Sequence, residues 1–214
     1  MAVLGDPFLS SQLSELLVFG RSAGESAVKF ARDIGLSQTV RLLDLGKAAE
    51  AKAVALRDQP GGGEHHAGLR KEMALATEKG CGIYRLGPEM EEACDKLAEI
   101  KQRYAKVTLE DRSSVWNTDW VTALELGYQL DVAEAMAQSA LARKESRGAH
   151  QRLDGFETRD DVNFLAHSLA NYRPGSAPEI TYGPVKITKS QPAQRAYGAL
   201  GEQLEKAKKD AAHA

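Results

Sequence analysis

Four basic side chains in the third quarter of the chain are best suited by type and spacing to chemistry: Arg143, Arg147, His150 and Arg152. Guanidinium groups form paired hydrogen bonds with carboxylates and phosphates, so this arginine cluster could hold a dicarboxylate or a phosphate. The alternative is pairing within the chain, because buried arginines are normally neutralised by acids. Acids at suitable spacing are Glu145, Asp154, Asp160, Asp161 and Asp119. Their abundance favours internal pairing over ligand binding.

Two predicted helices must position the arginine cluster. The first, over residues 117–127, begins with side chains that can cap a helix and ends at a glycine. The second, over 131–148, also ends at a glycine, as a left-handed C-cap would require. Its apolar stripe is Val132, Met136 and Ala140. Arg143 and Arg147 continue this stripe at four-residue spacing, which predicts that both guanidinium groups lie on the inward-facing side of the helix.

Other residues that could do chemistry give weaker patterns. His65 and His66 are adjacent and would point in different directions on a helix, so we expect exposed cap residues, and we predict no metal ligands. Cys81 and Cys94 have no metal-binding spacing and fit reduced thiols. Cys94 lies on a predicted helix and is expected in the protein core. No Gly-x-Gly-x-x-Gly motif for a dinucleotide occurs.

The composition excludes several classes of protein. The chain has 214 residues, enough for one domain or one and a half, and a net charge of −2, which gives no case for nucleic acid or an acidic membrane. No apolar run approaches transmembrane length, and residues 1–5 lack the basic region of a secretory signal. We therefore expect a cytoplasmic protein without direct membrane insertion.

Four further helices are predicted upstream of the arginine cluster, over 10–33, 36–59, 64–79 and 88–106. The fourth has the clearest apolar stripe: Met90, Ala93, Cys94, Leu97, Ile100 and Tyr104. The third, the fourth and the 131–148 helix can bury their apolar faces together in an antiparallel bundle. The fold class expected is mainly α: an antiparallel three-helix, spectrin-like bundle with an extra N-terminal helix and a small C-terminal segment containing short strands.

The segment after the bundle has a different character. Thr158 should cap a short helix that extends through Leu169, and residues 179–188 read as two short strands broken at Gly183-Pro184. Residues 202–214 should form a frayed helix or be disordered. The sequence thus predicts three units: 1–59 with the N-terminal helices, 60–170 with the bundle, and 171–214 with the extended segment and tail.

Several motifs in order along the chain resemble one known family. The longest is Ser139-Ala-Leu-Ala-Arg-Lys-Glu-Ser-Arg-Gly-Ala-His-Gln-Arg152. Others are Glu15-Leu-Leu-Val-Phe-Gly-Arg21, Gly82-Ile-Tyr-Arg85, Ser114-Val-Trp-Asn-Thr-Asp119, Arg159-Asp-Asp-Val-Asn-Phe-Leu165, Val185-Lys-Ile-Thr188 and Arg195-Ala-Tyr-Gly198. Together they resemble the C-terminal region of the succinate dehydrogenase/fumarate reductase flavoprotein subunit family, over almost the whole chain.

The resemblance implies an oxidoreductase that transfers hydride between succinate or fumarate and a covalently bound flavin, with FAD as the cofactor of the full-length family. The family's dinucleotide motif, flavin-linking histidine and proton-transferring arginine all lie upstream of the segment that matches this chain. A carboxylate-gripping arginine of the family aligns with Pro7 or Val3, neither of which can bind a carboxylate. We therefore expect no catalytic residue and no bound cofactor in this chain alone; the family's flavin-proximal positions are Gln12 and Leu13.

The resemblance also implies partners. In the family, the 10–33 helix closes the flavin domain and points its N-terminus at the flavin; alternatively, its small residues simply permit tight helix packing. The family segment that aligns with Arg143, Glu145, Arg147, His150 and Arg152 braces the helical domain against the flavin domain. Expected partners are the flavin-binding domain and the iron–sulfur subunit, at the cytoplasmic face of the membrane, with a homodimer possible for the isolated chain and no nucleic acid.

Two alternatives remain beside a flavoprotein fragment. One is a free-standing helical interaction module that has lost the enzyme. The other is the C-terminal part of an L-aspartate oxidase-like flavoenzyme, which shares the Glu145-Ser-Arg-Gly148 segment. The motifs Trp116-Asn-Thr-Asp119 and Arg159-Asp-Asp-Val162 favour the dehydrogenase/reductase family. Succinate oxidation and fumarate reduction both fit these motifs.

Overall fold

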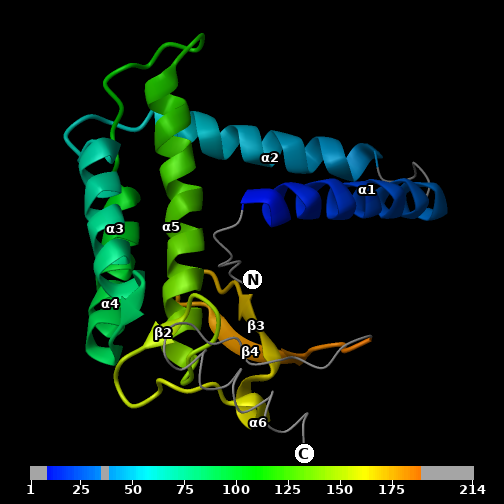
Figure 1. Ribbon diagram of the computed structural model, residues 1–214. Coiled ribbons are helices and arrows are strands. Elements are labelled where there is room, and N and C mark those ends of the chain that lie inside the picture. Colours follow the sequence, from blue (N-terminus) through cyan, green and yellow to red (C-terminus); the bar gives the residue numbers. More distant parts are fainter. Residues whose placement is uncertain (1–8, 35–38, 189–214) are drawn as a thin grey trace, which may run out of the picture.

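The computed structural model describes residues 9–34 and 39–188, with side chains described over 16–34 and 42–188 (Figure 1). Its helices are α1 (Leu9–Ile34), α2 (Thr39–Arg57), α3 (His66–Cys81), α4 (Gly87–Tyr104), α5 (Thr118–Ala142) and α6 (Asp161–Phe164). Its strands are β1 (Tyr84–Arg85), β2 (Gln151–Arg152), β3 (Ala166–Asn171) and β4 (Glu179–Pro184). The mainly α fold class with short C-terminal strands is confirmed. No helix in the described part of the chain combines the length and apolarity needed to cross a bilayer.

Helices α3, α4 and α5 pack side by side as the predicted bundle (Figure 1). Helix α4 buries the stripe that the sequence predicted: Met90, Ala93, Cys94, Leu97 and Ile100, with Tyr104 partly buried. The bundle core also contains Leu69, Val107, Leu109, Ala123, Leu126, Leu130, Ala133 and Ala137. A fully buried aliphatic side chain is worth roughly 1.5–3 kcal/mol, so this core holds the three helices together.

Helix α5 corrects two predictions. It is one continuous helix, capped by Asn117, rather than two helices separated at Gly127. Gly127 is needed for close packing, because a Cβ there would lie 2.6 Å from the hydroxyl oxygen of Tyr104. Val132 and Met136 do not face the core; they are 52% and 37% exposed. Because α5 carries apolar residues around its whole circumference, spacing alone could not identify its buried face.

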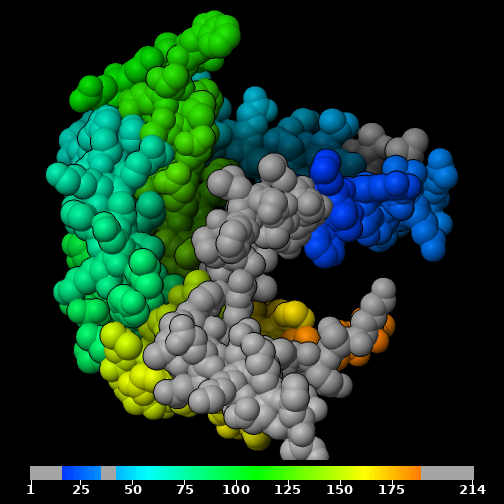
Figure 2. All heavy atoms as spheres, in the orientation of Figure 1, coloured from blue at the N-terminus to red at the C-terminus, as the bar shows by residue number. Residues whose placement is uncertain are grey.

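Helices α1 and α2 extend away from the bundle, as Figures 1 and 2 show. Helix α2 is attached to α5 by a 2.9 Å hydrogen bond from the indole Nε1 of Trp120 to the carbonyl oxygen of Ala53, and by Arg57 stacked on the same ring. Every described side chain of α1 is exposed. Gln12 and Leu13 belong to α1, but their side chains lie outside the described part.

The C-terminal elements differ from the prediction. Helix α6 is capped by Asp160 rather than Thr158 and ends at Phe164, so it does not reach Leu169. Residues 166–171 instead form β3, which pairs antiparallel with β4, and β4 is one strand that ends at Pro184. A short apolar segment fits a helix or a strand, and here its pairing with β4 decides between them. The hairpin of β3 and β4 spans the boundary that the sequence predicted at residue 170. The division of the chain into three units remains a prediction.

A second, smaller sheet joins distant parts of the chain. Strands β1 and β2 are parallel, with Tyr84 opposite Gln151 and Arg85 opposite Arg152. This pairing places the end of α3 beside the arginine cluster. The 195–198 motif and the predicted C-terminal tail lie outside the described residues.

Candidate functional site

The arginine cluster lies in the loop that follows α5. The helix ends at Ala142, and Arg143 is its C-cap residue, so the cluster does not continue the helix as predicted. Arg147 and His150 exchange backbone hydrogen bonds of 2.9 and 3.1 Å, and Gly148 occupies the intervening turn at φ +60°. Gly148 is therefore a turn residue rather than a helix cap. The chain leaves the helix because side chains of this loop bind backbone groups of neighbouring segments.

Glu145 is the centre of the cluster and is fully buried. It accepts hydrogen bonds of 2.8 and 3.0 Å from Arg147, a third of 2.8 Å from the backbone N–H of Asp160, and another from Arg143. Burial raises the pKa of Glu145, but the hydrogen bonds from Arg147, the Asp160 N–H and Arg143 outweigh burial and lower it overall. Glu145 is therefore an ionised carboxylate shared by two guanidinium groups.

Arg143 ties the end of α5 to the C-terminal hairpin. Its guanidinium donates to the carbonyl oxygens of Phe164 and Ala166 at 2.9 and 2.6 Å. The same group lies 5.5 Å from the ring centre of Phe164 and 5.9 Å from that of Tyr182. Such cation–π contacts add to the hydrogen bonds, so Arg143 joins three segments with one side chain.

Arg152 forms the second half of the cluster and is only 3% exposed. It makes a bidentate pair with Asp154, at 2.8 and 2.6 Å, and donates to the carbonyl oxygen of Arg143 at 3.2 Å. Asp154 in turn accepts a 2.6 Å hydrogen bond from the backbone N–H of Gly87, at the start of α4. This chain of contacts fixes the loop to the start of α4 and to the end of α5, which lie at the same end of the bundle.

His150 lies between two arginine-bearing segments and is almost fully buried. Its Nε2 lies 3.1 Å from the carbonyl oxygen of Arg143, and its Nδ1 lies 2.7 Å from a guanidinium nitrogen of Arg85. Burial lowers the pKa of His150, and the nearby arginine charges act in the same direction. The contacts fit a neutral ring that donates from Nε2 and accepts at Nδ1, which is a structural role rather than that of a cationic ligand group.

The arginines of the cluster are thus paired with acids of the same chain. Arg143, Arg147 and Arg152 are each paired with an acid and largely buried, with side-chain exposures of 13%, 27% and 3%. Of the acids expected to pair, Glu145, Asp154 and Asp161 do so, and Asp160 contributes its backbone N–H. The structure supports internal pairing over a dicarboxylate or phosphate site. The sequence did not reveal the part played by Arg85, although it belongs to a recognised motif.

Asp119 lies apart from the cluster and contacts the two adjacent histidines instead. His65 caps α3 as expected, because its Nδ1 accepts a 3.2 Å hydrogen bond from the backbone N–H of Ala67. His66 does not fit the prediction, because it is buried, with 5% exposure, rather than solvent-exposed. Its Nε2 lies 2.6 Å from Oδ1 of Asp119.

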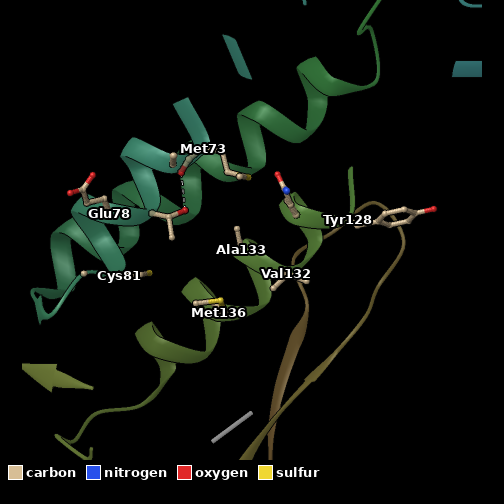
Figure 3. Close-up of a pocket in the computed structure, with 11 residues that line it drawn as sticks. Met73, Glu78, Cys81, Tyr128, Val132, Ala133 and Met136 are labelled. Carbon is tan, nitrogen blue, oxygen red and sulfur yellow. Dashed lines mark hydrogen bonds between the residues drawn. The ribbon is translucent and has the colours of Figure 1, made fainter. Parts of the chain in front are cut away.

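An apolar groove of about 590 Å³ runs between α3 and α5 (Figure 3). Met73 and Cys81 line one side, and Tyr128, Val132 and Met136 line the other. Burial raises the pKa of the Cys81 thiol, so this sulfur stays protonated and is not an activated nucleophile. The groove is an apolar surface that no other described segment covers, and Glu78 is the one carboxylate among its lining residues.

Comparisons with known proteins agree with the motifs. A sequence model of the family described as fumarate reductase flavoprotein C-term matches residues 70–197. The fumarate reductase flavoprotein subunit of Haemophilus influenzae is 50% identical over 200 residues, covering 94% of this chain and 33% of that protein. The succinate dehydrogenase flavoprotein subunit of Rickettsia bellii is 32% identical over 182 residues, covering 84% and 30%.

A solved structure gives the same result. A mutant of the FrdA subunit of E. coli quinol fumarate reductase superposes with a TM-score of 0.80 at 49% identity, covering 86% of this chain and 32% of that one. The chain spans about a third of the length of the curated relatives that it matches. On the combined match of family model, sequence and structure, the chain belongs to the fumarate reductase/succinate dehydrogenase flavoprotein family and corresponds to its C-terminal domain.

Proposed function

We propose that this chain is the helical domain that braces the flavin-binding domain of a fumarate reductase flavoprotein and contacts the iron–sulfur subunit. Electrons would pass between that subunit and FAD held upstream, at the cytoplasmic face of the membrane. The chain itself would supply neither the flavin site nor the catalytic groups. It would act by holding the flavin domain and its partner in position.

The observation that carries the proposal is the saturated arginine cluster after α5. Its guanidinium groups are paired with Glu145, Asp154 and Asp161 and reach backbone carbonyls of three segments. Buried ionic networks of this kind fix one geometry rather than bind a ligand, because a missing partner would leave an unpaired buried charge. A rigid support is what a bracing domain requires.

Exposed apolar surface supports the same proposal. Helix α1 presents several large apolar side chains to solvent: Leu16, Leu17, Val18, Phe19, Val28, Phe30 and Ile34. A surface of this kind normally marks a contact with another protein part. We infer that α1, whose early positions include Gln12 and Leu13, packs against the flavin domain near the cofactor.

Relatives named fumarate reductase favour that reaction over succinate oxidation. They reach 50% identity, against 32% for a relative named succinate dehydrogenase. The proposal of fumarate reduction rests on this difference in identity and on the name of the structural relative. The free-standing interaction module is the second candidate, and it predicts the same lack of activity for the isolated chain.

The test is the absorbance spectrum and fumarate turnover of the purified 214-residue chain. We expect no flavin band and no fumarate reduction with a reduced viologen dye as electron donor. A yellow protein with flavin near one per chain, or measurable turnover, would contradict the proposal, because it would place the cofactor site within this domain.

A further inference from the structure

Two histidines and an aspartate meet where the N-termini of α3 and α5 come together. The Nε2 atoms of His65 and His66 lie 3.2 and 2.6 Å from the same carboxylate oxygen, Oδ1 of Asp119. One potential ligand atom from each residue lies within 4.8 Å of the other two. The side chain of His66 is 6% exposed, that of Asp119 17%, and that of His65 40%. The cluster is therefore buried on the side of His66 and open to solvent on the side of His65.

Backbone hydrogen bonds to its second oxygen fix the orientation of the Asp119 carboxylate. Its second oxygen, Oδ2, accepts backbone hydrogen bonds from Glu110 and Asp111 at 3.0 and 3.3 Å, which leaves Oδ1 facing the histidines. The cluster therefore contains a carboxylate oxygen whose direction is fixed by the outer contacts of its partner oxygen, as ligands of metal sites usually are.

Both histidines compete for one acceptor atom in this cluster. Asp119 can only accept, so both imidazoles must donate from Nε2 to one oxygen, with ring centres 4.2 Å apart. The other ring nitrogen of His66, Nδ1, is buried and has no hydrogen-bond partner among the described residues. A cation placed between the two Nε2 atoms and Oδ1 of Asp119 could replace the two Nε2 protons.

The geometry points to a site for a divalent transition-metal ion, of the borderline-soft class that includes Zn²⁺, Ni²⁺ and Cu²⁺. The ligands are Nε2 of His65, Nε2 of His66 and Oδ1 of Asp119, with at least one position left to water. Bonds of roughly 2.0–2.1 Å in a tetrahedral arrangement place neighbouring ligand atoms a little over 3 Å apart. The His65 contact already has this spacing, and the His66 contact needs to open by less than 1 Å.

Binding requires each neutral ring to carry its single proton on Nδ1. For His65 this breaks the capping bond from the Ala67 N–H, at an exposed position where water can replace it. For His66 no hydrogen bond at Nδ1 within the described part of the chain is broken. The partial positive charges of two helix N-termini oppose a cation, so we expect micromolar rather than nanomolar affinity.

The test is a titration of the untagged full chain with Co²⁺, whose visible absorbance reports tetrahedral coordination, followed by displacement with Zn²⁺. His65→Asn removes one ligand and keeps a side chain that caps helices well. We expect it to weaken Co²⁺ binding at least about tenfold, since even outer-shell partners of metal ligands are worth that much. The matched control, His167→Asn on the exposed part of β3, should bind like the wild type.

Thermal melting provides a second measurement. Zn²⁺ should raise the melting temperature of the wild type and of the His167→Asn variant, because a bound ion links the starts of α3 and α5 in the folded state only. At the same Zn²⁺ concentration the melting temperature of the His65→Asn variant should rise by less, because its affinity is lower. The absence of a saturable one-to-one Co²⁺ complex would overturn the inference, as would equal affinity in His65→Asn and wild type.

Discussion

Replacing Glu145 should destabilise the chain more than replacing any single arginine around it. Glu145→Gln keeps the shape of the side chain but removes the negative charge that faces Arg143 and Arg147. The new amide group also turns a donor toward the backbone N–H of Asp160 or toward a guanidinium, so at least one hydrogen bond is lost. Two guanidinium groups then share no ionised acid at the centre of the cluster.

The expected loss of folding stability depends on which contacts Arg143 and Arg147 keep. Breaking a buried ion pair costs about 3–5 kcal/mol. Arg147 is 27% exposed and keeps its contact with Asp161, and Arg143 keeps two backbone carbonyls, so we expect the lower end, about 3 kcal/mol. In Arg147→Ala, Glu145 still holds Arg143 and the Asp160 N–H. No buried acid is left unpaired there, so that variant should cost only about 1–2 kcal/mol.

Urea unfolding at neutral pH, followed by circular dichroism, measures both variants. We expect a lower midpoint with an unchanged slope, because the change affects stability and not the surface exposed on unfolding. A Glu145→Gln variant within about 0.5 kcal/mol of wild type would refute the account of the cluster, since changes that small are typical of surface positions. So would a larger loss in Arg147→Ala than in Glu145→Gln.

Three other expectations concern the bundle and α1. The pKa of Glu72 is lowered from 4.5 to about 2, mainly because Glu72 accepts hydrogen bonds from Arg103. The stabilising effect of Glu72 is therefore complete above about pH 4.5 and lost as pH falls toward about 2, so acid unfolding curves of wild type and Glu72→Gln should converge there. Gly127→Ala should lower stability by about 1–3 kcal/mol because its Cβ meets Tyr104, whereas Gly68→Ala, with open space, should raise it by about 0.4–1 kcal/mol; equal effects in urea unfolding would contradict this. The isolated chain should dimerise through the exposed apolar side of α1, and light scattering that shows a strict monomer at micromolar concentration would contradict it.

The sequence predicted those elements whose apolar residues occupy one face. Helix α4 has charged residues opposite its stripe, and its buried side was identified correctly. Helix α5 is apolar on all sides, so Val132 and Met136 were assigned to the core although the core lies on the face of Leu126 and Leu130. The strand β3 was missed because its pairing with a segment eight or more residues away determines its conformation.

The candidate site was predictable in chemistry but not in geometry. The abundance of acids around the arginine cluster indicated internal pairing, and the structure contains it. The sequence could not show that Glu145 alone would serve two arginines, or that Arg85 would reach His150 from a strand more than sixty residues away. Likewise, adjacency in sequence suggested divergent histidines, whereas the N-cap position of His65 turns both rings toward Asp119.

Fumarate reduction by a chimera is the most direct test of the bracing role. The part of this chain that matches the Haemophilus influenzae flavoprotein would replace the corresponding third of that protein, which would supply the flavin domain. We predict that the chimera binds FAD and reduces fumarate, and that Glu145→Gln lowers turnover together with thermal stability. A folded chimera without FAD or fumarate turnover would contradict the account, because this chain would then be unable to support a flavin domain.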